Sequence, residues 1–288
     1  MARSGVRTEH LTGSPSVSDD HAFSPDWLRL REPHDHAARS VGLVARLAGL
    51  LPPAPHVLEM ASGLGSGARF VSAHLGCAAH WTLVDHDPRL LAAARTTMEA
   101  WARRHPDRAP RSLDVQPLDL RAGFPDGPWD AVVTQALLDL VSESWLDELA
   151  DWLEARRIPF LGALTVDGRV HWHRPHPLDA EVQAAFRAHQ QLDRGFGPSP
   201  GPRAAPLLAE KLEARGFEVR LEPADWQIPA EATQMLGFMV DGTAEAARVT
   251  HAVSAQVDAW HVQRTEDVRC GRVSLTVGHQ DLLASPAR

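Results

Sequence analysis

Residues 56–67 read HVLEMASGLGSG, and this stretch decides the fold of the 288-residue chain. Its first five residues, 56–60, are apolar enough for a buried strand and too few for a helix. Small residues fill positions 61–67, and residues 68–75 then have a helical pattern. A strand, a glycine-rich turn and a helix N-terminus form the geometry in which the backbone closely approaches a nucleotide-like ligand.

Acidic residues stand at the ends of successive predicted strands around this turn. Glu59 lies just before the turn, Asp85 ends the strand at 81–84, and Asp119 follows the strand-like run at 113–118. An acid at the end of the second strand can accept hydrogen bonds from ribose hydroxyls. The turn alone is weak evidence for a nucleotide site, because small-residue loops are common. The acids at the strand ends make the interpretation more specific.

Three motifs, LEMASGLG, LVDHDP and PLDL, resemble those of the class I S-adenosylmethionine-dependent methyltransferases. The resemblance is specific over residues 56–140 and architectural beyond them. It implies an α/β fold, with a doubly wound, Rossmann-like, seven-stranded, mostly parallel sheet, helices on both faces and an antiparallel last strand. It also implies the cofactor S-adenosyl-L-methionine and the product S-adenosyl-L-homocysteine. The family usually has glycine where this chain has Ala61, which is the mildest departure.

The resemblance places a cofactor site along the carboxyl edge of the sheet. The implied cofactor-binding residues are Arg31, Glu59, Ala61, Ser62, Gly63, Gly65, Asp85, His86, Asp119, Leu120 and Gln135. A leading helix predicted at 34–51 would cover the crevice, and Gln135 would end the fourth strand, which faces donor and acceptor. Arg31 precedes that helix, and it is equally plausible that Arg31 lies on a solvated helix face and does not bind the cofactor.

Two other classes of function share this turn. A nicotinamide-dependent oxidoreductase with a Rossmann domain would bind a pyrophosphate dianion, whereas S-adenosylmethionine brings a sulfonium and an ammonium, which an acid-lined crevice attracts. A non-catalytic protein that binds an adenosyl cofactor is the other alternative. The sequence favours methyl transfer to a small-molecule acceptor by in-line displacement.

Composition and charge limit the partners. The chain is 44% hydrophobic and 23% charged, which is ordinary for a globular protein. Its formal net charge of −8 argues against nucleic acid as a partner. No apolar run approaches the roughly 18 residues that span a bilayer, and the first residues do not resemble a signal peptide. We therefore expect a cytoplasmic protein with no membrane partner; its oligomeric state stays open, with a homodimer as one option.

Changes in pattern divide the chain. Residues 1–22 predict a flexible tail, and residues 23–288 a class I methyltransferase domain. Within it, residues 173–206 contain a long Gly/Pro loop that suits an acceptor-binding lid, and residues 229–266 predict a helical insertion. An alternating strand at 272–277 would close the sheet.

Candidates for a general base flank the predicted lid. His176 and His189 are the candidate bases, with Asp193 as a partner, although any single histidine is more often a surface or capping residue. The segment HWHRPH at 171–176 offers no evident third metal ligand, so no metal is predicted. The sequence leaves open which acceptor and which atom are methylated.

Overall fold

The computed structural model describes residues 23–190, 192–193, 195–250 and 254–287. The predicted tail at 1–22 lies outside the described residues. The helices are α1 (Pro25–Ala38), α2 (Val41–Ala48), α3 (Ser66–His74), α4 (Pro88–Arg104), α5 (Glu143–Arg156), α6 (Asp179–Gln190), α7 (Ala204–Glu213), α8 (Thr233–Val249) and α9 (Ser254–Arg269). The strands are β1 (His56–Met60), β2 (His80–Asp85), β3 (Ser112–Pro117), β4 (Ala131–Gln135), β5 (Phe160–Trp172), β6 (Phe217–Pro223), β7 (Trp226–Ile228) and β8 (Leu275–Pro286).

The strands form one sheet in the order β3-β2-β1-β4-β5-β8-β6, and β7 pairs with β8 beside this path. Strands β1 to β5 are parallel to one another, and β8 runs antiparallel to β5, β6 and β7. The order reverses at β1 and β4, and at such a point the carboxyl ends of the strands leave a crevice for a ligand. The predicted mostly parallel sheet with an antiparallel last strand is confirmed.

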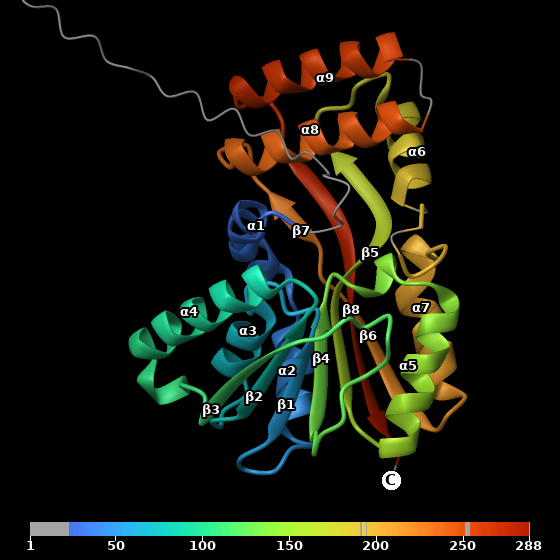
Figure 1. Cartoon of the computed structure of the whole chain (residues 1–288). Helices are drawn as coiled ribbons and strands as arrows, with labels where there is room; N and C mark the ends of the chain where they lie inside the picture. Colours follow the sequence, from blue (N-terminus) through green and yellow to red (C-terminus); the bar gives the residue numbers. More distant parts are fainter. Residues whose placement is uncertain (1–22, 191, 194, 251–253, 288) are drawn as a thin grey trace, which may run out of the picture.

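Helices cover both faces of the sheet, as Figure 1 shows. Helices α5 and α7 bury Leu149, Leu153 and Leu208 against one face. Helices α2, α3 and α4 bury Leu47, Val71 and other apolar side chains against the opposite face. Because helices cover both faces, the carboxyl edge of the sheet is where a fold of this kind can bind a ligand.

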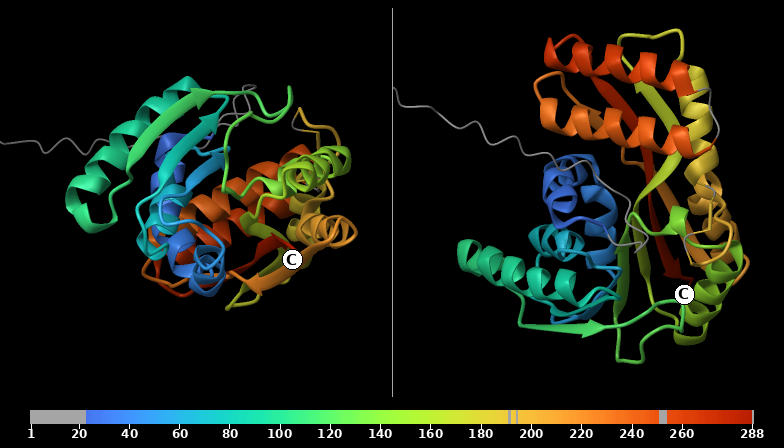
Figure 2. Two further views of the ribbon diagram at one scale, coloured as in Figure 1. Left: turned by 90° about the horizontal axis from the view of Figure 1, so that it is seen from below. Right: turned by 45° about the horizontal axis from the view of Figure 1, so that its top comes forward.

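Strands β5 and β8 continue past this edge and carry a second group of elements, which we call the cap: β7, α6, α8 and α9 (Figures 1 and 2). The two strands pair as far as Trp172 and Leu275, with register shifts between Gly162 and Thr165 and between Val166 and Val170. A third apolar core, which includes Trp172, Val182 and Trp260, joins the cap helices to the extended strands. The cap therefore stands on the same side as the carboxyl edge.

Two predicted boundaries are wrong. The expected helix at 34–51 is in fact two helices, because α1 continues through Pro33 and ends at Ala38, and Ser40 caps α2 by accepting a hydrogen bond from Leu43 N. The last strand lies at Leu275–Pro286 and not at 272–277. Within the described part of the chain, no helix has the length and apolar character needed to span a membrane.

Candidate functional site

Three residues of the glycine turn have a left-handed backbone conformation. Ala61, Gly63 and Gly65 have φ of 50°, 52° and 71°, a region that glycine reaches at little cost. Ser62 N donates to Val84 O at 3.0 Å, and Gly65 N donates to Ser62 O at 2.7 Å. These bonds hold the turn between the ends of β1 and β2.

Glu59 lies beneath this turn and is fully buried. Its Oε2 accepts a hydrogen bond from Ala68 N at 3.1 Å, while Oε1 makes no well-aligned hydrogen bond with the described residues, although the nearby Gly67 amide helps to lower the pKa of the carboxyl. Burial raises the pKa of the Glu59 carboxyl to about 7, against the opposing effects of the Ala68 amide and Arg39. A Cβ at Gly67 would lie 2.2 Å from Glu59 Oε1, so only glycine leaves room for the carboxylate at that position.

Arg39 reaches the same place from the junction of α1 and α2. Its Nη1 donates to Gln135 Oε1 at 3.3 Å, its guanidinium lies 4.4 Å from the ring centroid of Phe70, and its Nε has no partner among the described residues. Burial lowers the pKa of Arg39, and the neighbouring carboxylates of Asp281 and Glu59 oppose that shift. The buried group therefore contains an acid and a cation that each have an unsatisfied polar atom.

Asp281 of β8 completes this group and was missed from the sequence. Its two oxygens accept hydrogen bonds from Ser40 N and Leu164 N, both at 2.8 Å. Burial raises the pKa of the Asp281 carboxyl, and Arg39 opposes the rise. Its partners are distant in the chain, so no local pattern could have indicated it.

Asp85 stands where the resemblance places the ribose-binding acid. Its Oδ2 accepts from Gly63 N at 2.9 Å and its Oδ1 from Asp87 N at 3.0 Å. A carboxylate offers about four lone-pair sites, so acceptor capacity remains beyond these two bonds. Asp85 thus fixes the glycine turn and keeps the ability to bind hydroxyl groups.

His86 and Asp119 lie beside it at the β2 and β3 ends. A hydrogen bond to Asp85 raises the pKa of His86, and the charges of Asp87 and Asp119 add to the rise. Hydrogen bonds from Arg121 lower the pKa of Asp119 to about 2. Leu120 is buried in the neighbouring core. The structure therefore brings together the predicted acids of the strand ends.

Helix α1 lies over the glycine turn. Leu28 Cδ1 is 3.2 Å from the place that a Cβ on Gly63 would occupy, and Glu32 forms a bidentate pair with Arg69 of α3. Arg31 is placed elsewhere: it pairs with Asp35 at 2.9 Å and does not contact the turn. The helix over the turn is therefore α1, through Leu28, and not a helix at 34–51 as expected.

The loop at 195–201 lies against the segment that follows β4. Ser199 Oγ donates to the backbone oxygen of Asp139, and a Cβ at Gly195 would lie 2.9 Å from Arg121 Nη1. At its far end Pro202 packs on Gly168 of β5. This part of the predicted lid therefore contacts both the crevice edge and the base of the cap.

The candidate base residues do not converge. His176 Nδ1 accepts from Leu178 N at 3.1 Å and thereby caps the start of α6, whereas His189 lies at the other end of this 12-residue helix, which is about 18 Å long. Asp193 Oδ1 accepts from Gly195 N and Gly197 N and shapes the loop. Within the described residues, no three His, Cys, Asp or Glu side chains gather at metal-binding distance.

Comparison with known proteins gives matches in structure only. No protein-family model matches the chain, and no curated protein matches its sequence. A cyclopropane-fatty-acyl-phospholipid synthase-like protein from Lactobacillus casei superposes with a TM-score of 0.50 and 17% identity, over 88% of this chain and 90% of that one. The cyclopropane synthase MmaA2 from Mycobacterium tuberculosis gives 0.48 and 15%, over 93% and 95% of the two chains. The mycolic acid cyclopropane synthase CmaA1, crystallised with SAH and CTAB, gives 0.48 and 14%, over 91% and 94%.

These proteins are too distant in sequence to transfer an activity. The similarity to the Lactobacillus protein and the strand order are evidence about the fold only. They show that the chain has the class I methyltransferase fold.

Proposed function

We propose that this protein is an S-adenosylmethionine-dependent methyltransferase that acts on a small-molecule acceptor. The observation that carries the proposal is the buried group under the glycine turn. Glu59 Oε1 and Arg39 Nε are both buried and make no well-aligned hydrogen bond with the described residues. The amino-acid end of S-adenosylmethionine would supply an ammonium to Glu59 and a carboxylate to Arg39. A buried charge is favourable only when it is paired, and this ligand would pair both.

The remaining contacts fit the other end of the cofactor. Asp85 would accept hydrogen bonds from the ribose hydroxyls. His86 and the Asp119–Leu120 segment would line the site of the adenine ring. When bound, the cofactor supplies a methyl group on a sulfonium sulfur. A dinucleotide would bring a pyrophosphate dianion close to Asp85 and Asp119 at the strand ends, and repulsion from these acids opposes the oxidoreductase alternative.

The chain's own residues would act by positioning and by excluding water. Methyl transfer from a sulfonium would be an in-line displacement, so the main task of the chain's residues would be to align donor and acceptor. Leu28 covers the turn, and the loop at 195–201 lies against the segment that follows β4. A general base is needed only where the acceptor atom carries a proton, and the assignment of His176, His189 and Asp193 to that role stays a prediction.

Titration calorimetry tests this proposal. Wild-type protein should bind S-adenosylmethionine and should not bind NADH measurably. Asp85→Asn should weaken binding of the methyl donor by about a hundredfold, because hydrogen bonds to a charged group contribute roughly 1.5–3 kcal/mol each. Asp114→Asn, on the exposed part of β3, is the matched control and should bind like wild type. Tight binding of NADH, or unchanged affinity of Asp85→Asn, would refute the assignment.

A further inference from the structure

A separate cleft of about 600 Å³ lies between the distal half of β5 and helix α6. Its lining includes the β5 residues from Gly168 to Trp172, and Gln183 and Arg187 of α6. Small-molecule sites typically enclose about 300–1,000 Å³, so the cleft has the size of a ligand site. No residue of the glycine turn lines it.

Helix α6 turns a polar stripe toward this cleft. Asp179, Gln183 and Arg187 line it at intervals of four residues, which places them on one helix face. The apolar side chain of Val182, on another face, packs into the core of the cap. Gln183 is buried, Asp179 is half-buried and Arg187 is exposed, so the stripe runs from the partly buried start of the helix to a solvent-accessible cation at its end.

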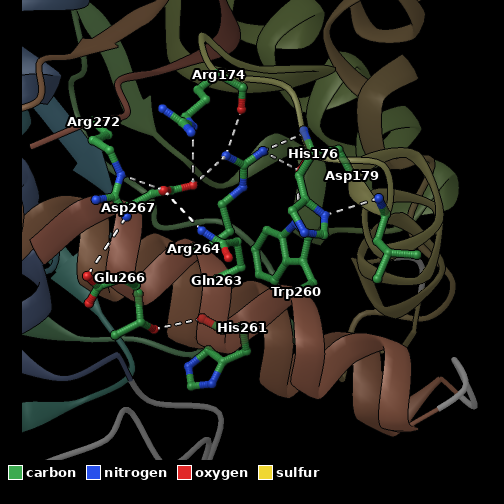
Figure 3. Close-up of polar contacts among 12 residues, drawn as sticks. Arg174, His176, Asp179, Trp260, His261, Gln263, Arg264, Glu266, Asp267 and Arg272 are labelled. Atoms are coloured by element: carbon green, nitrogen blue, oxygen red, sulfur yellow. Dashed lines mark hydrogen bonds and ion pairs between the residues drawn. The ribbon is translucent and has the colours of Figure 1, made fainter. Parts of the chain in front are cut away.

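The charges of the cleft do not balance. Asp179 is paired with the buried Arg264, whose Nη2 contacts its carboxylate oxygens at 2.6 and 2.5 Å (Figure 3). Arg169 is held by Asp167 and Asp225. Arg187, in contrast, has no carboxylate partner among the residues that the structure describes. The cleft thus presents one uncompensated cation.

Two buried polar atoms of the lining residues also lack partners. Trp172 Nε1 and Gln183 Oε1 make no hydrogen bond within the described residues, although the side chains are 4% and 6% exposed. A buried donor or acceptor left unpaired costs about 1–3 kcal/mol. In addition, β4 pairs with β5 only as far as Ala163, so β8 alone flanks the distal half of β5. The cleft therefore offers a donor, an acceptor and a strand edge that a polar ligand can satisfy.

The cleft leads toward the cofactor crevice. Gly168 lines its base, and Pro202 packs on Gly168 at the end of the loop whose Ser199 contacts Asp139 after β4. Arg187 lies two turns along α6 from Asp179, about 12 Å by the helix rise, and α6 then runs into this loop. Gly168, Pro202 and Ser199 thus connect the cleft to the segment that follows β4, and Arg187 lies at the end of α6 nearest this loop.

We propose that this cleft binds the methyl acceptor, and that the acceptor is a small organic anion whose acidic group pairs with Arg187. This inference rests on the proposed methyltransferase function. A guanidinium presents a fork of donors that matches a carboxylate. Gln183, one turn earlier on the same face of α6, would accept a hydrogen bond from a hydroxyl or amino group close to that acidic group.

The first test uses 4-hydroxybenzoate as the probe, because it combines a carboxylate, a ring and a hydroxyl group. Calorimetry at low salt with the full chain and no cofactor should show saturable binding. Arg187→Gln should weaken it at least tenfold, and the neutral 4-hydroxybenzamide should bind equally weakly to wild type. Arg220→Gln, an exposed arginine on β6, is the matched control and should leave probe affinity unchanged. Absence of binding, or equal affinity of Arg187→Gln and wild type, overturns the cleft assignment.

The second test separates this inference from the proposed function. Arg187→Gln should bind S-adenosylmethionine with wild-type affinity. If wild-type protein fails to bind S-adenosylmethionine, the proposed function is refuted, and the probe experiment alone decides whether the cleft binds an anion. An acceptor found by screening anionic metabolites for S-adenosylhomocysteine release should show a KM raised at least tenfold in Arg187→Gln with little change in kcat. An unchanged KM overturns the role of Arg187 in acceptor binding.

Discussion

Ala61 has a left-handed backbone with φ of 50° at the position where the resembled family has glycine. An L-residue in this region costs about 1–2 kcal/mol, whereas glycine loses roughly 0.5–1 kcal/mol of conformational entropy on folding. Ala61→Gly should therefore stabilise the protein by about 0.5 kcal/mol, measured as the free energy of unfolding in urea. Ala92→Gly, at an exposed position within α4, is the opposite control and should destabilise the protein by about 1 kcal/mol. A destabilising effect of Ala61→Gly would contradict the strain at this turn.

The cofactor-site residues that the sequence predicted are those that share a local pattern. Glu59 and Asp85 end strands beside a glycine turn, and the fold brings such ends together at one edge. Arg39 and Asp281 could not be placed in this way, because Asp281 binds Ser40 across 241 positions of the chain. Arg31 illustrates the converse: it sits on the covering helix, yet its guanidinium is directed to Asp35. Side-chain direction depends on tertiary partners that periodicity does not contain.

Asp179 of α6 joins the cap helices α6 and α9, because it accepts hydrogen bonds from both Arg264 and Trp260 of α9. Arg264 is fully buried and donates to Asp179 and to the backbone oxygen of Arg174 (Figure 3). Its guanidinium also lies 4.9 Å from the ring centroid of Trp172. Removing one partner of a buried pair typically costs about 3–5 kcal/mol. Arg264→Met should lower the free energy of unfolding by about 3 kcal/mol and speed hydrogen exchange along α6.

The matched control lies on the same helix. Arg269 pairs with Glu266 at 2.7 Å, but both side chains are largely in solvent. Exposed pairs contribute little, so Arg269→Met should unfold at the wild-type urea concentration. Equal effects of the two substitutions would show that the Arg264 pair does not hold the cap together.

Elements were predictable where apolar periodicity dominates and were misplaced where tertiary contacts override a local signal. Pro33 is a strong stop signal, yet α1 continues through it, and this helix is held by Trp27 stacked on Phe238 and by Arg31 over Trp226. The last strand includes Gly278, where a Cβ would lie 2.1 Å from Asp167 Oδ1. Glycine is a weak strand former, and its role in this close approach depends on a residue of another strand.

At the scale of the whole molecule, folding, cofactor binding and pH are linked through Glu59. Its pKa is about 7 in the folded protein and about 4.5 in an unfolded chain, so the folded state binds the proton more tightly. This contribution, roughly 3 kcal/mol, is fully present below pH 4.5 and is lost as the pH rises through 7. His279, whose pKa burial lowers to about 4, acts in the opposite direction, since its contribution is present above pH 6.5 and is lost as the pH falls through 4. Wild type and Glu59→Gln should therefore differ in the slope of stability against pH between 4.5 and 7.

Binding of a ligand ammonium reverses the preference of Glu59, because the ammonium favours the ionised carboxylate. Below pH 7 the protein should therefore release close to one proton on binding S-adenosylmethionine, and its affinity should fall by up to tenfold for each pH unit lowered. Calorimetry in two buffers of different ionisation enthalpy measures the released proton directly. Glu59→Gln should bind more weakly at pH 8 and should abolish the release, whereas His279→Asn, a buried titratable group outside the glycine turn, should retain it. Proton release that persists in Glu59→Gln would show that another group takes the ammonium, and the arrangement under the glycine turn would then need a different ligand orientation.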